Sequence, residues 1–189
     1  MTYYGGKEIA AAFRTVRENT VKIAEEIPEE QYQFRATPDT KTVGEMLTHI
    51  ALSPNFQHHV HSNNLTDMKT LNFTELFQKF SAEEAKPRTK AELVALLKGE
   101  GEKFASYVES LPEPFLTEQV AMMPGAQPAA KTRFEMLLGT KEHEMHHRGQ
   151  LMTMQRMIWL VPHITRQMEE RMARRMASQQ TQQTQDASR

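Results

Sequence analysis

Residues 132–161 read TRFEMLLGTKEHEMHHRGQLMTMQRMIWLV. Thr132 and Glu135 form a capping box, because the hydroxyl can accept the N–H of the residue three positions later while the carboxylate reaches back to the N-cap N–H. Residues on one face then recur at alternating intervals of four and three, the heptad spacing of a helix packed in a bundle. These residues are Met136, Thr140, His143, His147, Gln150, Met154, Met157 and Val161. The pattern predicts one long helix, to about residue 160, with two histidines on its packed face.

Three other segments show helical periodicity. They cover about residues 7–27, 42–61 and 89–111. Two of them begin with the same capping box, formed by Thr42 with Glu45 and by Thr89 with Glu92. Pro54 is expected to bend the second helix. Together with the long helix, these segments predict an all-α protein with a four-helix bundle.

The connections and the C-terminal part complete the predicted organisation. Residues 62–88 are expected to hold a short accessory helix, and residues 112–131, rich in proline, an irregular loop. No strand-like alternation is visible. The predicted domains are the bundle over residues 1–162, a C-terminal helical extension over residues 163–177, and a disordered tail over residues 178–189 that lacks apolar anchors.

Composition excludes several classes of function. The chain of 189 residues has 23 Lys and Arg against 24 Asp and Glu, so it lacks the basic excess typical of nucleic-acid binding. It contains no cysteine, which excludes disulfides, thiolate metal sites and a cysteine nucleophile. Neither a signal peptide nor a membrane-spanning run is recognisable. We therefore expect a soluble cytoplasmic protein that binds neither nucleic acid nor membranes.

The two histidines of the long helix predict a metal site. His143 and His147 are four residues apart, so their imidazoles project from one side of the helix and can share one ion. Two ligands seldom suffice, and His49 on the predicted 42–61 helix is the best third candidate, since bundles build metal sites from facing helices. Three histidines leave coordination positions open for water or substrate, as in catalytic sites.

The remaining histidines receive other interpretations. His146 is expected at the rim of the site or behind its ligands, although pairing with His143 is an alternative. His58, His59 and His61 lie among Asn and Ser near a helix end, so a solvated loop is the preferred interpretation. His163 follows a proline and is expected to be exposed.

His143–His147 also matches the His-Glu-x-x-His signature of zinc proteases, in which Glu144 would act as general base. The extended signature with a third histidine is absent, and no strand for gripping a peptide is visible. Glu144 is preferentially read as part of a solvated face, and Gln150 as a neutral residue on the packed face. Both stay weak catalytic candidates, because either could orient ligands or solvent.

Three motifs together resemble the DinB/YfiT-like superfamily. They are Phe34–Asp39 (FRATPD), Thr42–Ala51 (TVGEMLTHIA) and His143–Leu151 (HEMHHRGQL). The resemblance covers roughly residues 7–162. It implies a four-helix bundle, a site for nickel, zinc or a similar divalent ion with His49, His143 and His147 as its ligands, and a homodimer.

Relatives of this kind include S-transferases and isomerases that use low-molecular-weight thiols, and proteins described as metal-dependent hydrolases. The leading hypothesis is therefore a metal-dependent enzyme that activates a thiol, in the manner of an S-transferase, or water, for attack on a small molecule. Two alternatives stay open. One is a hydrolase of the His-Glu-x-x-His type, and the other is a non-enzymatic, metal-stabilised dimer whose methionine-rich helices form the contact.

Overall fold

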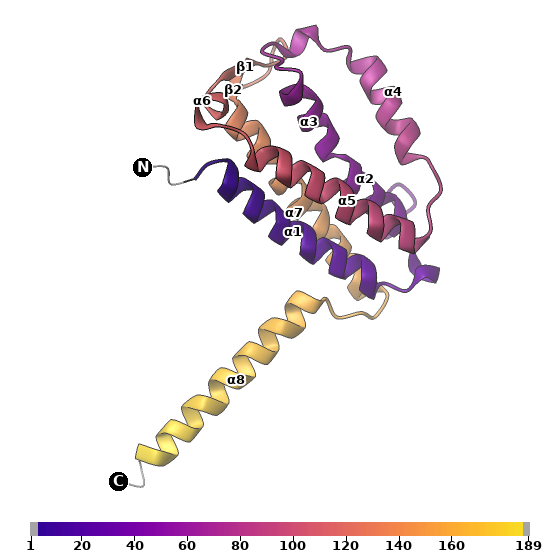
Figure 1. Cartoon of the computed structure of the whole chain (residues 1–189). Helices are drawn as coiled ribbons and strands as arrows, with labels where there is room; N and C mark the ends of the chain where they lie inside the picture. The colour runs from indigo at the N-terminus through magenta and orange to yellow at the C-terminus, as the bar shows by residue number, and fades with distance from the viewer. Residues whose placement is uncertain (1–3, 187–189) are drawn as a thin grey trace.

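A computed structural model describes residues 4–186 and shows the predicted all-α bundle (Figure 1). Its main helices are α1 (Gly6–Glu26), α2 (Val43–Leu52) continued by α3 (Pro54–Ser62), α5 (Lys90–Glu109) and α7 (Arg133–Met157). The helix α1 packs along α5 and α7, and α2 packs against the same two helices. This arrangement places α2 and α7 side by side, which is the condition for a site between them.

The helix starts follow the capping boxes. At α2, Glu45 N donates to Thr42 Oγ1 over 3.1 Å, and Thr42 N donates to Glu45 Oε2 over 2.7 Å. The boxes at α5 and α7 are formed in the same way. The segment predicted as one helix over 42–61 is two helices, because Pro54 cannot donate a backbone hydrogen bond and instead occupies the first turn of α3.

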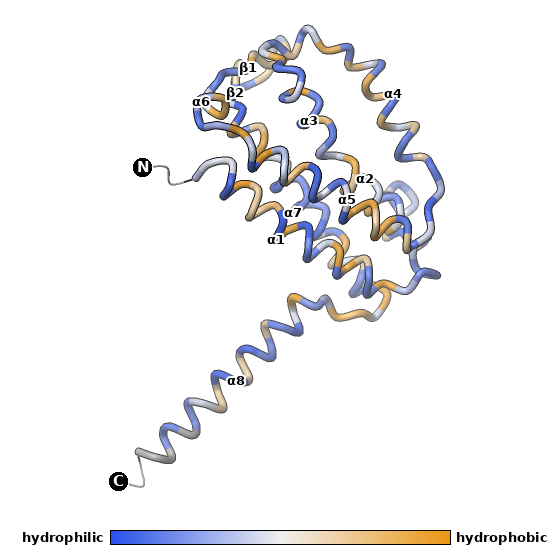
Figure 2. Tube along the Cα trace, viewed as in Figure 1, coloured by the Kyte–Doolittle hydropathy of each residue, from blue (hydrophilic) through white to orange (hydrophobic). Residues whose placement is uncertain are grey.

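The core fills the bundle from end to end. One cluster surrounds Ile23, Leu47 and Leu97, and a second contains Phe13 and Phe104, whose ring centroids lie 5.0 Å apart. Hydrophobic residues recur along α1 and α5, whereas α8 (His163–Asp186) is hydrophilic over most of its length (Figure 2). None of the helices within residues 4–186 has the length and apolar character needed to cross a bilayer.

The connection after α3 holds a short 3-10 turn (Met68–Thr70) and the expected accessory helix, α4 (Phe73–Glu84). Figure 1 shows α4 beside α2 and α3 at the outer side of the bundle. Leu76 is its one buried residue. Cavities of about 450 and about 270 Å³ both include residues of α4 in their linings. The accessory helix is therefore only lightly anchored.

The connection over 112–131 differs from the expected irregular loop. It contains α6 (Glu113–Leu116) and an antiparallel hairpin of β1 (Gln119–Ala121) and β2 (Ala130–Thr132), with Gln119 opposite Thr132. Ala121 N also donates to Thr66 O over 2.8 Å. Three residues per strand are too few to show the alternation by which strands are recognised in a sequence. A further 3-10 turn, Glu29–Gln31, follows α1.

The helix α8 projects away from the bundle (Figure 1). The sequence predicted a helical extension over 163–177 and a disordered tail over 178–189. The helix instead continues to Asp186, and residues 187–189 lie outside the described part of the chain. Glutamine, which is frequent over residues 178–186, has good helix propensity, so the absence of an apolar anchor does not by itself end the helix.

Candidate metal centre

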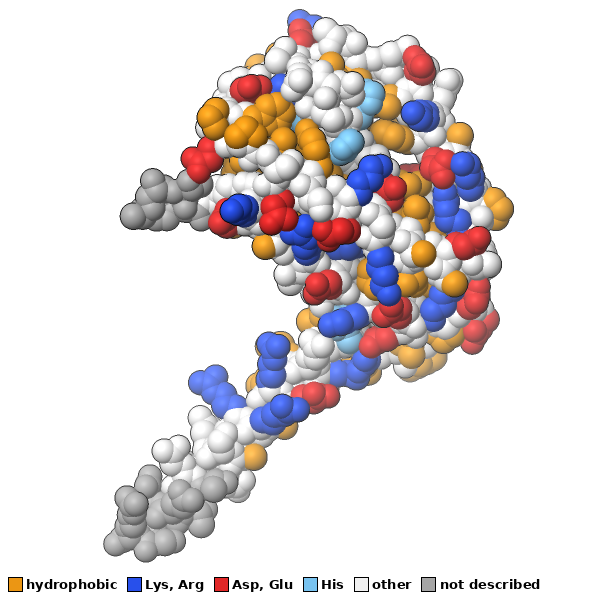
Figure 3. All heavy atoms as spheres, in the orientation of Figure 1, with side chains coloured by type: hydrophobic (Ala, Val, Ile, Leu, Met, Phe, Trp, Pro, Cys, Tyr) orange, Lys and Arg blue, Asp and Glu red, His pale blue; other side chains and the backbone are white. Residues whose placement is uncertain are grey.

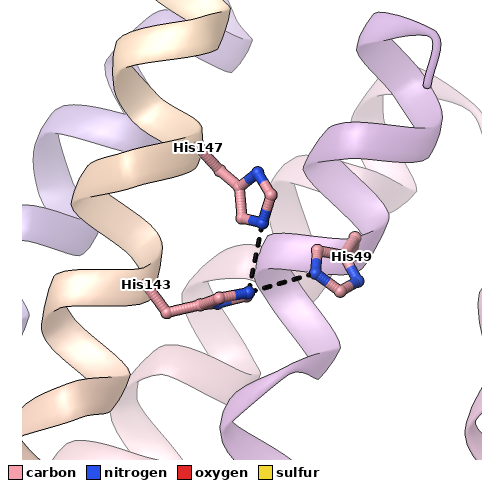
Figure 4. A group of neighbouring side chains, drawn as sticks. All are labelled: His49, His143 and His147. Carbon is pink, nitrogen blue, oxygen red and sulfur yellow. Dashed lines mark hydrogen bonds between the residues drawn. The ribbon is translucent and has the colours of Figure 1, made fainter. Parts of the chain in front are cut away.

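The structure brings His49, His143 and His147 together between α2 and α7 (Figure 4). His143 Nε2 lies 3.3 Å from His49 Nε2 and 3.1 Å from His147 Nε2. Nitrogens bound about 2.05 Å from one ion, at angles between 90° and 109°, would be about 2.9–3.4 Å apart. Both distances are therefore those expected between ligands of a single ion, and one ligand atom from each of the three rings lies within 4.8 Å of the others. Within residues 4–186, no other group of three or more His, Cys, Asp or Glu side chains brings its ligand atoms within 4.8 Å of one another.

The environment of His143 and His147 disfavours the charged form of their imidazoles. Burial, followed by the nearby rings of His147 and His49, lowers the pKa of His143 to about 4. Burial also lowers the pKa of His147. Both rings are neutral near pH 7, so their nitrogens have lone pairs for a cation.

Two oxygen acceptors orient the outer rings. His49 Nδ1 lies 2.9 Å from Glu84 Oε1 of α4, and His147 Nδ1 lies 2.7 Å from Gln150 Oε1, one turn along α7. With Nδ1 donating its proton to these acceptors, Nε2 of each ring is unprotonated and faces His143. Gln150 is exposed, not on the packed face as predicted. Its side-chain oxygen accepts the hydrogen bond that orients the His147 ring. Glu84 was not found from the sequence, since it lies in a connection 35 residues from His49.

Glu144 has a different role from those considered for it. Its side chain is 1% exposed, which corrects the preferred interpretation of a solvated face. Arg17 Nε donates to Glu144 Oε1 over 3.0 Å, and Arg17 Nη2 donates to Oε2 over 3.0 Å. One step along a helix turns a side chain by about 100°, so Glu144 leaves the side of α7 that carries His143. A carboxylate held by arginine is not available as the general base of a zinc protease.

The histidines of α3 are not in a loop. His58 and His59 are partly buried on the helix, and His61 is 1% exposed with Nδ1 3.2 Å from Arg133 Nη1. The expectation of a solvated cluster is therefore wrong. The polar residues that suggested a solvated loop lie at the end of α3, which closes with Ser62. The buried partner of His61 is on α7, far away in the sequence, so the local pattern could not reveal it.

Of the two remaining histidines, His146 lies where it was expected and His163 does not. His146 is exposed, and its ring centroid lies 5.0 Å from that of His147, which puts it at the rim of the cluster. His163 is 4% exposed, not solvated as predicted, because its Nε2 lies 2.9 Å from Asn19 Oδ1 where α8 meets α1.

The cavity of about 450 Å³ opens beside the histidines, and His49 and His143 form part of its wall. Lys41 and Glu84 also line it, with Lys41 Nζ 3.7 Å from Glu84 Oε2. A concave space next to convergent polar groups is the usual setting of a small-molecule site.

Comparison with known proteins first gives solved structures of similar fold. Among solved structures, a DinB-like protein from Bacillus subtilis is 23% identical, with a TM-score of 0.60 over 80% of this chain and 92% of its own. YfiT from Bacillus subtilis, described as a "probable metal-dependent hydrolase with an unusual four-helix bundle topology", is 12% identical, with a TM-score of 0.64 over 85% of this chain and 91% of its own. A protein from Streptococcus pneumoniae is 17% identical, with a TM-score of 0.62 over 82% and 93%.

At these identities the likeness shows a shared fold. No curated protein matches the sequence. The sequence model of the DinB superfamily matches residues 12–151, which include most of the bundle and all three clustered histidines. The chain therefore belongs to the DinB superfamily.

Proposed function

We propose that this protein is a metal-dependent enzyme that holds a divalent ion on His49, His143 and His147 and activates a thiol or water for attack on a small molecule. The observation that carries the proposal is the convergence of three Nε2 atoms at 3.1 and 3.3 Å spacing. Nitrogen ligands of this kind suit zinc and nickel. Three protein ligands leave coordination positions for substrate.

The residues present fit such an ion. The outer rings of His49 and His147 direct unprotonated Nε2 atoms at His143, because Glu84 and Gln150 accept their Nδ1 protons. A proton on His143 Nε2 could satisfy only one of these two acceptors. A cation at the meeting point would satisfy all three rings, and the low pKa of His143 disfavours the imidazolium form, which has no free nitrogen lone pair.

When bound, a divalent ion acts as a Lewis acid that lowers the pKa of a coordinated thiol or water. The protein contributes the alignment of the rings, through Glu84 and Gln150, and an adjoining cavity for the small molecule. Transfer to a low-molecular-weight thiol is the leading reaction, in keeping with the resemblance of the three motifs. Hydrolysis by activated water is the second, and the description of YfiT favours it. Glu144 has no part in either, since Arg17 holds it.

The test begins with elemental analysis of the purified protein for nickel, zinc and related ions. We expect about one ion per chain, and loss of that ion in His49→Ala, His143→Ala and His147→Ala. His59→Ala, on α3 outside the cluster, is the matched control and should retain the ion. A thiol-transfer screen and an ester-hydrolysis screen, each with and without chelator, then separate the two reactions. Full metal retention in His49→Ala would refute the proposed ligand set.

A non-enzymatic role as a metal-stabilised dimer is the second candidate, because α8 exposes Met168, Met172 and Met176 on a projecting helix. Figure 3 shows hydrophobic and arginine side chains along this arm. The candidate would be favoured by a tightly held ion with no chelator-sensitive turnover, together with a dimer in solution.

A further inference from the structure

The cavity beside the histidines is elongated. On α2 and α3, its lining follows one helical face, at offsets of three, four, seven and eight residues from His49. These positions are Leu52, Ser53, Phe56 and Gln57. With a rise of about 1.5 Å per residue, the lining extends roughly 12 Å from His49 to Gln57. A molecule that fills the cavity would have one end at the histidines and the other near Gln57.

Charge is confined to the histidine end of this cavity. Its two ionised side chains are Lys41 and Glu84, which face each other over 3.7 Å, and Glu84 also contacts His49. Away from them, the wall consists of aromatic, aliphatic and neutral polar residues, including Phe56, Phe77 and Phe80. A charged group placed there would be desolvated without a counter-ion, which is costly.

Two polar atoms on the wall lack partners. Gln57 Oε1 and Thr140 Oγ1 are both buried and form no hydrogen bond within the described chain. Thr140 is 6% exposed and lies one turn from His143 on α7, while Gln57 lies on the facing α3. A buried acceptor without a donor destabilises the structure that contains it. A ligand N–H or O–H group would supply that donor.

We infer that the cavity binds an uncharged, elongated molecule with an aromatic or aliphatic body and a hydrogen-bond donor at the end remote from the reacting group. The inference rests on the proposed function, since it names the substrate class of the same site. The reacting group lies at the histidines, the body contacts the phenylalanines, and the donor meets Gln57 Oε1 at the remote end.

The test uses three probes with the same metal-chelating head: 4-phenylbutanohydroxamic acid, its para-carboxamide and its para-carboxylate. Their dissociation constants for the zinc-loaded protein are measured by titration calorimetry. We expect the carboxamide to bind about tenfold more tightly than the unsubstituted probe, because it gives a donor to an unpaired acceptor. The carboxylate should bind more weakly than both. Equal or tighter binding of the carboxylate would overturn the inference.

Two variants localise the effect. Gln57→Leu should abolish the advantage of the carboxamide over the unsubstituted probe, and Phe80→Ala should weaken all three probes. Gln33→Leu and Trp159→Ala are matched controls at exposed positions outside the cavity, and they should leave the three constants unchanged. If the carboxamide still binds Gln57→Leu about tenfold more tightly than the unsubstituted probe does, Gln57 is not the group that meets the ligand's donor.

The zinc content of each sample is measured separately, so that failure of the metal site is not confused with failure of the inference. If neither zinc nor nickel binds, the proposed function fails. The cavity is then tested in the zinc-free protein with a pair that lacks the chelating head, 4-butylbenzamide and 4-butylbenzoate. Preference for the amide would support an uncharged ligand, and preference for the benzoate would refute it.

Discussion

At the scale of single residues, Glu84 and Gln150 are positioning residues for the histidine cluster. Each accepts from the Nδ1 of one ring, at 2.9 Å and 2.7 Å respectively. Removing such an outer partner commonly weakens metal binding about 10–100-fold, because the ring loses its orientation and some of its basicity. Their contribution is separable from that of the ligands, because replacing either residue leaves all three histidine side chains in the sequence.

The first prediction concerns Glu84. Glu84→Ala should raise the zinc dissociation constant about 10–100-fold, and Glu84→Gln, which keeps an oxygen acceptor, should recover part of the affinity. Competition with a chromogenic chelator measures both constants. Glu83→Ala, which removes the neighbouring carboxylate of α4, is the control and should bind zinc normally. An unchanged affinity in Glu84→Ala would show that His49 needs no carboxylate partner.

A second prediction concerns His61, which lies outside the metal cluster. Burial, and then the charge of Arg133, lowers the pKa of His61 from 6.5 to about 4. Between these values the unfolded chain binds more protons than the folded chain, so the free energy of unfolding falls as pH falls from about 6.5 to about 4. The stability that the neutral His61 ring contributes to the free energy of unfolding is fully present above pH 6.5 and amounts to roughly 3 kcal/mol.

Urea unfolding between pH 4.5 and pH 7.5 tests this effect. In His61→Asn, the amide oxygen can still accept from Arg133 but does not titrate, so the acid loss of stability should become shallower. His143, whose pKa is also lowered, leaves a residual slope. Parallel pH profiles for the two proteins would rule out His61 as a source of acid sensitivity.

At the scale of secondary-structure elements, Arg17 connects four helices. Besides Glu144 of α7, its guanidinium donates to Leu97 O of α5 over 2.7 Å and to Ile50 O of α2 over 3.0 Å. A Cβ atom at Gly101 of α5 would lie 2.8 Å from Arg17 Cγ, so glycine is needed there for close approach. This buried ion pair therefore fixes the depth and rotation of α7, and with it the position of His143.

The third prediction is that Glu144→Gln lowers the free energy of unfolding by about 3–5 kcal/mol, because it leaves the buried charge of Arg17 without its counter-ion. Under native conditions the variant should still bind one zinc, which distinguishes a structural glutamate from a general base. Glu102→Gln is the control, since its pair with Arg14 joins α1 and α5 at the surface, where Glu102 is 60% exposed. Its effect should be under about 1 kcal/mol. Loss of turnover in Glu144→Gln at full stability would contradict this assignment.

The elements show how far sequence patterns reach. Capping boxes located the starts of α2, α5 and α7, because the signal is local and chemically specific. The heptad stripe of α7 is correct at Met136 and Met154, but Gln150 and Met157 are exposed while Leu151 and Gln155 are buried. A straight helix drifts by about 20° per heptad, so a strict stripe rotates off the packed face over a helix of this length.

The same limits apply to the site. The ring cluster was predictable, since two of its members share a helix turn and the third lies on an apolar face of a predicted neighbour. The contacts of Glu84, Arg17 and His61 join residues 35, 127 and 72 positions away from their partners. Periodicity defines the faces of individual helices, and it carries no information on which side chains from separate helices meet.

At the scale of the whole molecule, α8 is an arm with few ties to the bundle. Its contacts include His163 with Asn19 and Arg166 with Glu26, both near its first turn. Isolated helices are marginal in water, and most helical stability in proteins comes from packing. A 24-residue helix that exposes three methionines therefore favours contact with a second copy of the chain.

The fourth prediction is a homodimer that depends on this arm. Light scattering should give a dimer mass for the wild-type protein and a monomer mass for the triple variant Met168→Gln, Met172→Gln, Met176→Gln. Met123→Gln, at an exposed position in the hairpin loop, is the control and should stay dimeric. The triple variant should keep its zinc, since the histidine cluster is built within one bundle. A monomeric wild-type protein would refute the prediction.

The light anchoring of α4 has a kinetic consequence. Leu76 is its one buried residue, yet the helix carries both Phe80 of the cavity wall and Glu84 at His49. Segments with few buried contacts open locally, at a smaller free-energy cost than global unfolding. Each such opening would remove Phe80 from the cavity wall and, in the same event, separate Glu84 from His49. Amide protons of α4 should therefore exchange with deuterium well before those of α5, and that exchange rate sets a lower limit on how often the helix opens.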